Sequence, residues 1–495
     1  MTFTGDMLWW LILLPALGAA LSLLMPSPLA ALTTAAVGVP LIAAVAAWAV
    51  ASVFQIGPLL SNGGWLHLDP LSAYHVVVMM VVFVLSSLYT IPYFRHTHEE
   101  HAFTLASARR FSALWYGALG AMALVLLSNN LGVMWVGVEA TTLLTAFLIC
   151  LHVSPFSLEA TWKYLIVCSV GVAFAFMGVL LVAASAGHAA SIDAHLLHWT
   201  HMRQIAGNLD PKLLKLAFVF ILVGYGTKAG LAPMHSWLPD AHSQAPAPVS
   251  AIFSGFMLNM ALYCIMRYIP LVDAATGGTG WAQNLLVIFG LMSIVIGAVF
   301  ILAQHDLKRF LAYCSVEHLG IIAMGLGLGP LGIFAALFHT LNHSVCKALG
   351  FFSAGRIGQI YGSHDMREIR GSLQTNRLWG TGLFVSILVL IGVAPFAIFM
   401  SELLILKAAV EAGRYVVMAV FLLGVATVFL AALRYAINMA WGEKSRTCKV
   451  QEDSPIEWLI VIAPLLLLFI LGLWMPASFR HVLESAAAVL AGRTT

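Results

Sequence analysis

Charged residues are scarce in this chain: Asp, Glu, Lys and Arg make up 9% of its 495 residues, whereas 61% of the residues are hydrophobic. A soluble domain averages about 25% charged residues, so this composition excludes a soluble globular protein and indicates an integral membrane protein. The few charges are spread over short loops, which excludes the basic face of a nucleic-acid-binding protein.

Signals of secretion, redox chemistry and catalysis are also missing. No lysine or arginine precedes Arg95, and a signal peptide needs a positively charged start, so the apolar run at 7–25 is expected to remain as a membrane helix. The six cysteines lie far apart without a Cys-x-x-Cys pair, which predicts small buried side chains rather than disulfides or cluster ligands. Nucleotide-binding glycine motifs and zinc or serine hydrolase motifs do not occur, so neither a catalytic domain nor a cofactor site is predicted.

The chain has instead a succession of apolar runs, each near the ~20 residues that a helix needs to cross a bilayer. These runs predict an all-α polytopic membrane protein with about fourteen transmembrane helices. They span residues 7–25, 29–54, 71–93, 111–128, 131–151, 162–186, 213–238, 248–269, 283–303, 308–329, 331–353, 378–408, 416–441 and 457–478.

Lysine and arginine are more frequent in one set of the loops between these runs, which includes residues 94–110, 354–377 and 442–456. Because basic loops stay on the cytoplasmic side, these loops are predicted to be cytoplasmic and both termini periplasmic. The expected location is a bacterial inner membrane.

Proline interrupts two of the runs. Lys228 lies five residues before Pro233, and Glu402 lies seven residues after Pro395 in the over-long run 378–408. Proline removes an intrahelical hydrogen bond, and in a membrane the freed carbonyl groups are tolerated only beside protein or a water-filled cavity. The runs enter from opposite sides of the membrane, which predicts an inverted repeat and a transport site at Lys228. The alternative is that Lys228 snorkels to the interface.

Ionisable groups within the predicted spans include Glu139, Lys163, Lys228, Glu317, His318, His339, His343, Lys347, Glu402, Lys407 and Arg434. Isolated at membrane depth, only four or five groups of this kind would already cost on the order of 10 kcal/mol. We therefore expect these groups to be paired or hydrated and to form one polar chain.

Glu139 lies in the middle of its span and is expected to need a cation such as Lys163 or Lys228. Because its protonation would respond to the charge on that cation, Glu139 is a candidate proton relay, and a purely structural ion pair is the alternative. Glu317 occupies a similar place two helices before the second broken run.

His339, His343 and Lys347 recur every four residues and share one helix face. Imidazole passes protons near neutral pH, so this stripe predicts a proton path, whereas the alternative is a set of core histidines. His343 or Lys347 is the expected partner of Glu402, because Lys407 points away from that face.

Two groups of loop histidines have a spacing that suits a metal ion or the collection of protons, with a solvated surface as the alternative. One group is His195, His198 and His201, and the other is His96, His98 and His101.

Three linked motifs occur in order along the chain. They are Gly226-Thr-Lys-Ala-Gly-Leu-Ala-Pro-Met-His-Ser-Trp-Leu-Pro-Asp-Ala-His242, His305-Asp-Leu-Lys-Arg-Phe-Leu-Ala-Tyr-Cys-Ser-Val-Glu-His318 and His339-Thr-Leu-Asn-His-Ser-Val-Cys-Lys347. From about Leu68 to Arg434 the chain resembles the antiporter-like subunits of respiratory complex I, Mrp antiporters and membrane-bound hydrogenases. Within that family, Pro395-Phe-Ala-Ile-Phe-Met-Ser-Glu402 looks most like the hydrogenase-4 component F branch.

The resemblance implies fourteen core helices with two inverted five-helix units, and it assigns proton translocation to Glu139, Lys228 and Glu402. The implied division is helices 1–3 in 1–110, the first repeat in 111–270, the second in 283–441, and the last helix and tail in 442–495. Many relatives carry a further lysine where this chain has Asn259, which can hold water but not a proton. Their proton path therefore does not carry over directly at this position.

The predicted function is that of a non-catalytic, proton-translocating membrane subunit of a multi-subunit redox complex, hydrogenase-4-like or complex I-like. Moving charge against a membrane potential takes about 2.3 kcal/mol per charge per 100 mV, so partner subunits must supply the driving reaction. The same polar chain suits two alternatives. One is an Mrp-type cation/proton antiporter, and the other is the membrane half of an inorganic-carbon uptake system that energises a cytoplasmic zinc protein.

Overall fold

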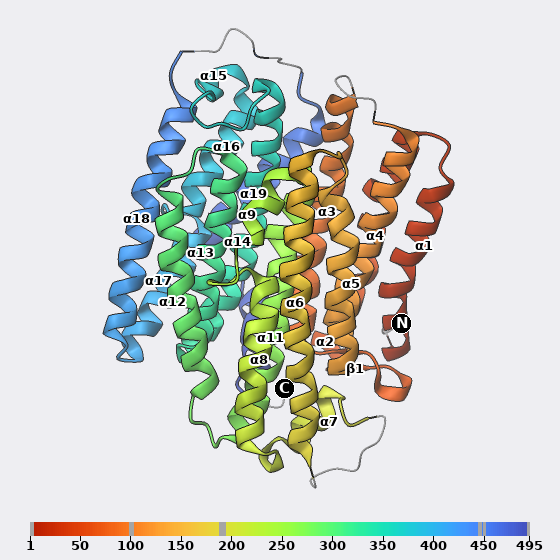
Figure 1. The fold of residues 1–495 in the computed structure, drawn as a ribbon, viewed down its shortest axis with the longest axis vertical. Coiled ribbons are helices and arrows are strands. Elements are labelled where there is room, and N and C mark those ends of the chain that lie inside the picture. The colour runs from red at the N-terminus through yellow and green to blue at the C-terminus, as the bar shows by residue number, and fades with distance from the viewer. Residues whose placement is uncertain (1–3, 99–102, 188–194, 444–447, 449–451, 493–495) are drawn as a thin grey trace.

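The computed structural model describes residues 4–98, 103–187, 195–443, 448 and 452–492. Within these ranges the protein is a bundle of helices that lie mostly side by side along one direction (Figure 1). Ten of the described helical spans are long and apolar enough to cross a membrane. The all-α prediction is confirmed in this form, and the only strands of the described part are the antiparallel pair β1 (Leu59–Leu60) and β2 (His67–Leu68).

The helices follow the predicted runs closely. The first ten are α1 (Trp10–Leu24), α2 (Pro28–Ile56), α3 (Pro70–His98), α4 (Leu105–Leu127), α5 (Leu131–Ile149), α6 (Pro155–Ala186), α7 (Trp199–Gln204), α8 (Pro211–Ala229), α9 (Trp237–Gln244) and α10 (Ala247–Ile252). The others are α11 (Leu258–Ala275), α12 (Trp281–Ile301), α13 (Leu307–Leu326), α14 (Gly329–Tyr361), α15 (Ser372–Thr375), α16 (Arg377–Leu390), α17 (Ala397–Glu411), α18 (Tyr415–Ala440), α19 (Pro455–Leu473) and α20 (Ala477–Leu490).

Several helices begin where the sequence places a capping side chain directly before a proline. Ser27 accepts a hydrogen bond from a backbone N–H of α2, Asp210 does so for α8, and Ser454 forms a capping box with Glu457 at the start of α19. Such side chains satisfy N–H groups that have no partner within the helix, and proline tolerates the first turn because its missing N–H is not needed there. Local chemistry therefore sets where these spans start.

Each of the two proline-containing runs forms a pair of helices, α8 with α9 and α16 with α17. The breaks share the pattern Gly-x-Ala-Pro, beginning at Gly230 and Gly392, whose φ angles are +73° and +71°. Their hydrogen bonds also match: Leu231 N–H donates to the Gly226 carbonyl, as Val393 N–H donates to the Leu388 carbonyl. Glycine is required here because a left-handed conformation ends a helix at little steric cost. Both interruptions expected from the sequence are confirmed.

The centre of the bundle consists of α14 and the span formed by α10, a π-helical turn (Phe253–Met257) and α11. Residues 247–272 are all buried, and so are residues 335–358 of α14. The two spans approach closely at Gly255, where a Cβ atom would lie 3.1 Å from the Ser344 carbonyl oxygen. These two spans join the halves of the bundle that contain the broken helices.

One feature of the chain ends, a helix within the predicted tail, was not predicted from the sequence. Part of the predicted tail is the helix α20, which packs against α3 and α14. The N and C markers lie toward the end of the bundle opposite α15 (Figure 1). The two ends of the chain therefore lie toward the same side of the bundle, as two periplasmic termini would require, and the periplasmic assignment of that side stays a prediction.

Candidate functional site

Lys228 lies in the last turn of α8, directly before Gly230 ends the helix, and its side chain is fully buried. Its Nζ atom donates hydrogen bonds to Thr142 Oγ1 at 2.9 Å and to the Tyr164 hydroxyl at 2.5 Å. It also lies 4.7 Å from the centre of the Tyr164 ring. The alternative of a snorkelling lysine is wrong, because neutral hydroxyl groups and an aromatic ring surround the ammonium group inside the protein.

The hydroxyl groups around Lys228 form an ordered chain. Thr145 donates to the Thr141 carbonyl at 2.6 Å, so the 2.6 Å contact between Thr145 Oγ1 and the Tyr164 hydroxyl has Tyr164 as its donor. Tyr164 thus accepts from Lys228 and donates to Thr145, which uses both of its hydrogen-bonding roles. This arrangement passes from the broken helix α8 through α6 to α5.

Glu139 lies on α5, one turn before Thr142, and is partly exposed. Its Oε1 atom accepts a hydrogen bond from Ser169 at 3.0 Å, and among the described residues no lysine forms an ion pair with it within 4.0 Å. Lys163 binds Glu159 and Asp240 instead, with its side chain 49% exposed. The predicted pairing of Glu139 with Lys163 or Lys228 is therefore wrong.

The second cluster lies beside the other broken helix. His318 Nδ1 of α13 and His339 Nε2 of α14 share a hydrogen bond of 2.9 Å, and His339 Nδ1 lies 2.9 Å from Ser401 Oγ of α17. Ser401 directly precedes Glu402, and all of these side chains are buried. Glu317 places Oε2 3.6 Å from His318 Nε2, which is an ion-pair distance rather than a hydrogen bond.

Hydrogen-bond partners assign the tautomers of this cluster. Ser401 donates its hydroxyl to the Ile398 carbonyl at 2.8 Å, so His339 Nδ1–H must be the donor to Ser401. In a neutral imidazole the other nitrogen then accepts, which makes His318 Nδ1–H the donor to His339. In this assignment His318 Nε2 is left as an acceptor that faces Glu317, and it forms no hydrogen bond within the described part of the chain.

His339, His343 and Lys347 share one helix face, as predicted, and this face meets α13. His343 packs on His318 with ring centres 5.2 Å apart, and Lys347 donates to the Leu311 carbonyl. The expected partner of Glu402 differs, however. Ligand atoms of Glu402, His318 and His339 lie within 4.8 Å of one another. The neighbours of Glu402 are therefore His318 of α13 and His339, which lies one turn before His343 on α14.

These three side chains form the only group in the described part of the chain whose spacing suits a metal ion. The facing nitrogens of His318 and His339 already bond to each other, so a metal would have to displace that bond. Of the loop histidines, His195 and His198 approach to 3.3 Å between their Nδ1 atoms, but they form no such group with His201. The side chains of His96, His98 and His101 lie outside the described residues.

Polar side chains also occupy the region between the two clusters. Ser254 of the π-helical turn and Ser315 of α13 lie 2.7 Å apart, and Asn259 donates to Ser344 of α14 at 2.9 Å. Hydroxyl and amide groups such as these hold protons or water in place without carrying charge.

Three hydroxyl-bearing residues of the two clusters were not predicted from the sequence. They are Thr142, Tyr164 and Ser401, which contact Lys228 or His339. Serine, threonine and tyrosine occur in apolar runs at little cost, so nothing in the sequence marks them there.

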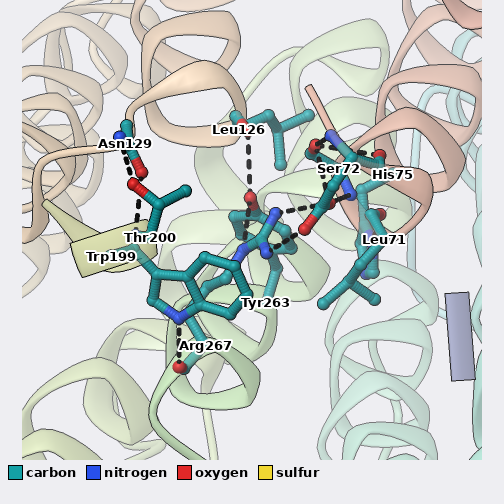
Figure 2. Close-up of polar contacts among 10 residues, drawn as sticks. Leu71, Ser72, His75, Leu126, Asn129, Trp199, Thr200, Tyr263 and Arg267 are labelled. Carbon is teal, nitrogen blue, oxygen red and sulfur yellow. Dashed lines mark hydrogen bonds and ion pairs between the residues drawn. The ribbon is translucent and has the colours of Figure 1, made fainter. Parts of the chain in front are cut away.

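A buried ion pair, also missed, lies toward the end of the bundle where the termini lie. Arg267 of α11 binds both carboxylate oxygens of Asp69, at 2.6 and 2.8 Å. Its guanidinium carbon also lies 4.6 Å from the ring centre of Trp199 and 4.9 Å from that of Tyr263, two residues labelled in Figure 2. Burial alone raises the pKa of Asp69, but the contact with Arg267 outweighs it and holds that pKa below its usual range. The pair connects α11 with the start of α3.

Breaking this pair is expected to destabilise the protein. In Asp69→Asn the charge of Arg267 stays buried without its counter-charge, which costs about 3–5 kcal/mol. We expect a clearly lower melting temperature of the detergent-purified protein. Arg480→Met is the control, because its pair with Glu484 is 66% and 52% exposed, and exposed pairs contribute about 0–1 kcal/mol. Equal melting temperatures for Asp69→Asn and Arg480→Met would contradict the role of the pair.

Two interrupted helices, one with a buried lysine and one with a buried carboxylate, define an ion-translocating membrane protein of the antiporter-like class. The chain belongs to the NADH:quinone oxidoreductase/Mrp antiporter transmembrane family, whose model matches residues 128–429. This confirms the resemblance found in the sequence.

Two curated relatives support the same placement. A hydrogenase-4 component F homolog from Methylacidiphilum infernorum is 34% identical over 430 residues, which cover 86% of this chain and 89% of the relative. One of the subunits of a Na(+)/H(+) antiporter from Alkalihalophilus pseudofirmus is 27% identical over 78% of each chain. These relatives are components or subunits of larger membrane systems.

Solved structures share the fold. A chain of the membrane-bound sulfane sulfur reductase, an archaeal respiratory membrane complex, superposes with a TM-score of 0.86 at 23% identity and covers 98% of both chains. A chain of respiratory complex I from Thermus thermophilus gives 0.82 at 22% identity, over 98% of this chain and 99% of the other.

Proposed function

We propose that this chain is the proton-translocating membrane subunit of a hydrogenase-4-like or complex I-like redox complex. The observation that carries the proposal is Lys228, a fully buried cation at the end of a broken helix whose direct partners, Thr142 and Tyr164, are neutral. Because no carboxylate of the described residues is paired with it, the ammonium group can give up its proton without leaving an unpaired anion in contact. A lysine locked in an ion pair would lack this freedom.

Glu139 would couple Lys228 to the rest of the complex. It is partly exposed, on α5, among exposed apolar side chains such as Val136 and Leu143, each 51% exposed. A neighbouring subunit against this face would reach Glu139 directly. Charge displaced by the redox reaction would then change the protonation of Glu139, and this would in turn change the protonation of Lys228.

The second half would carry the proton onward. Along the proposed proton path, Lys347 and Glu317 precede the His318–His339 pair, and Ser401 and Glu402 follow it. A proton delivered from Glu317 to the open Nε2 of His318 would release the proton on Nδ1 toward His339. The tautomers assigned above suit this direction of transfer.

The matching hydrogen bonds at the two Gly-x-Ala-Pro breaks support a repeat of the broken helix. We propose that this repeat is inverted, that the chain crosses the membrane fourteen times and that both termini are periplasmic. In this arrangement the first unit spans 111–270 and the second 283–441, after three helices in 1–110 and before the last helix and tail in 442–495. Each unit contributes one broken helix to a single path in a bacterial inner membrane.

Replacing Glu139 by Gln tests the coupling. We expect proton uptake by proteoliposomes that contain the intact complex to fall about 10²-fold, as is typical when a proton-transfer group is removed, and Glu139→Asp to keep part of the activity. Uptake is measured with a pH-sensitive dye during turnover of the complex. Glu411→Gln is the control, because Glu411 is an exposed carboxylate that binds Lys407. Wild-type uptake in Glu139→Gln would leave only a structural role for Glu139.

The polar chain also suits an Mrp-type cation/proton antiporter, and the relative from Alkalihalophilus pseudofirmus favours this as the second candidate. Purifying the complex and identifying its subunits separates the two. Nickel–iron hydrogenase and ferredoxin-like partners support the redox complex, whereas a set of small membrane subunits alone supports the antiporter.

A further inference from the structure

A cavity of about 280 Å³ opens near the end of the bundle that carries α15, away from the polar chain. Residues of three segments line it: the connection from α12 to α13, the connection from α14 to α15, and the last two turns of α18. Three of the lining side chains are the arginines Arg367, Arg370 and Arg434, and no acidic side chain is among them. Such a concentration of positive charge is unusual in a chain with so few charged residues.

Two of the three arginines have no carboxylate partner in the described part of the chain. Arg367 is neutralised by Asp365, with Nη2 and Oδ2 2.6 Å apart. Arg370 donates Nη1 to the Asn438 carbonyl at 3.1 Å and Nε to the Arg367 carbonyl at 3.3 Å, which holds its guanidinium group across the cavity. Arg434 is exposed on α18 and forms no ion pair there. The cavity therefore keeps two positive charges that an anion could neutralise.

The surface beside the cavity is apolar. Tyr435 of α18 donates its hydroxyl to the Leu302 carbonyl at 2.8 Å, which fixes the end of α12 against α18. Val299 of α12 is 58% exposed, Leu302 directly after α12 54%, and Leu430 of α18 70%. Aliphatic side chains as exposed as these on apolar spans suit contact with acyl chains.

We propose that this cavity binds the phosphate of an anionic phospholipid whose acyl chains lie along α12 and α18. Guanidinium groups match phosphate oxygens through paired, charge-assisted hydrogen bonds. Basic cavities between membrane helices at the headgroup level bind anionic lipids in this way. The adjoining aliphatic surface distinguishes a lipid from free phosphate, because free phosphate gains nothing from Leu302 or Leu430.

Lipid retention by the purified full-length chain tests the proposal. The chain is exchanged into a neutral detergent with phosphatidylglycerol or phosphatidylcholine, and the lipid bound per chain is counted by native mass spectrometry. We expect phosphatidylglycerol to be retained and phosphatidylcholine to be lost. In the double variant Arg370→Gln/Arg434→Gln, phosphatidylglycerol should bind about thirtyfold more weakly, as expected for the loss of two cations near a membrane surface.

Matched variants and a competing anion decide between the sources of the phosphate. Arg95→Gln removes an exposed arginine outside the cavity and should bind phosphatidylglycerol like the wild type. Arg370→Lys/Arg434→Lys keeps the charges and should bind better than the glutamine pair, which also controls for misfolding. Equal retention by the wild type and the glutamine pair would overturn the proposal. Displacement of the lipid by millimolar inorganic phosphate would instead assign a site for small anions.

Discussion

Lys228→Ala is expected to abolish proton translocation while the protein still inserts and assembles. The ammonium group is the only charge in the last turn of α8, and its two direct partners are hydroxyl groups. Without it, Tyr164 still donates to Thr145, so the hydroxyl chain remains but has no proton to pass. Removal of a group that transfers protons costs about 10²-fold or more in rate, so coupled proton uptake should fall to background.

The measurement is proton uptake by proteoliposomes that contain the intact complex, with the redox turnover recorded in parallel. Lys228→Met separates charge from volume, because methionine fills the space of the lysine stem, and it should be as inactive as Lys228→Ala. Lys407→Ala is the control, since Lys407 is exposed and binds Glu411. Wild-type uptake in Lys228→Met would remove Lys228 from the path.

Much of the fold can be predicted from hydropathy, because a membrane helix is defined by a local property, a run of apolar residues of sufficient length. The breaks at Gly230 and Gly392 can also be predicted, since proline and glycine act on the backbone within a few residues. Helix α20 was missed for the opposite reason. Its sequence is mixed in polarity, and only its packing against α3 and α14 shows where it belongs.

The site was predicted less completely. Lys228, Glu402 and the histidines were found because buried ionisable groups are costly and therefore rare in apolar runs. Their partners were not, because a partner is set by tertiary packing. Glu139 was expected to meet a lysine, yet its hydrogen-bond donor is Ser169 from the neighbouring α6. The charges of Asp69 and Arg267 lie near the ends of their spans, where charged side chains are commonly solvated. The sequence therefore does not indicate that they are buried, and only the structure shows that they pair.

The second half of the path depends on Glu402, whose carboxylate lies within 4.8 Å of ring nitrogens of both His318 and His339. Glu402→Gln keeps the shape of the side chain but removes the group that accepts the proton, so it should block coupled turnover. Glu402→Leu should do the same. Glu402→Lys should keep more activity, because the resemblance of this chain to its family implies that either charge serves at this position. A cavity of about 420 Å³ also lies beside Glu402 and gives the longer side chain room.

Proton uptake across these variants shows what the path requires at position 402. Uptake in the order wild type, Glu402→Lys, then Glu402→Gln and Glu402→Leu together, would identify an ionisable group as the requirement. Ser401→Ala should weaken uptake less than Glu402→Gln, since it removes the hydrogen bond that fixes the His339 tautomer but leaves every ionisable group in place. Full coupling in Glu402→Leu would rule the carboxylate out of the path. The path would then have to leave the His318–His339 pair by another route.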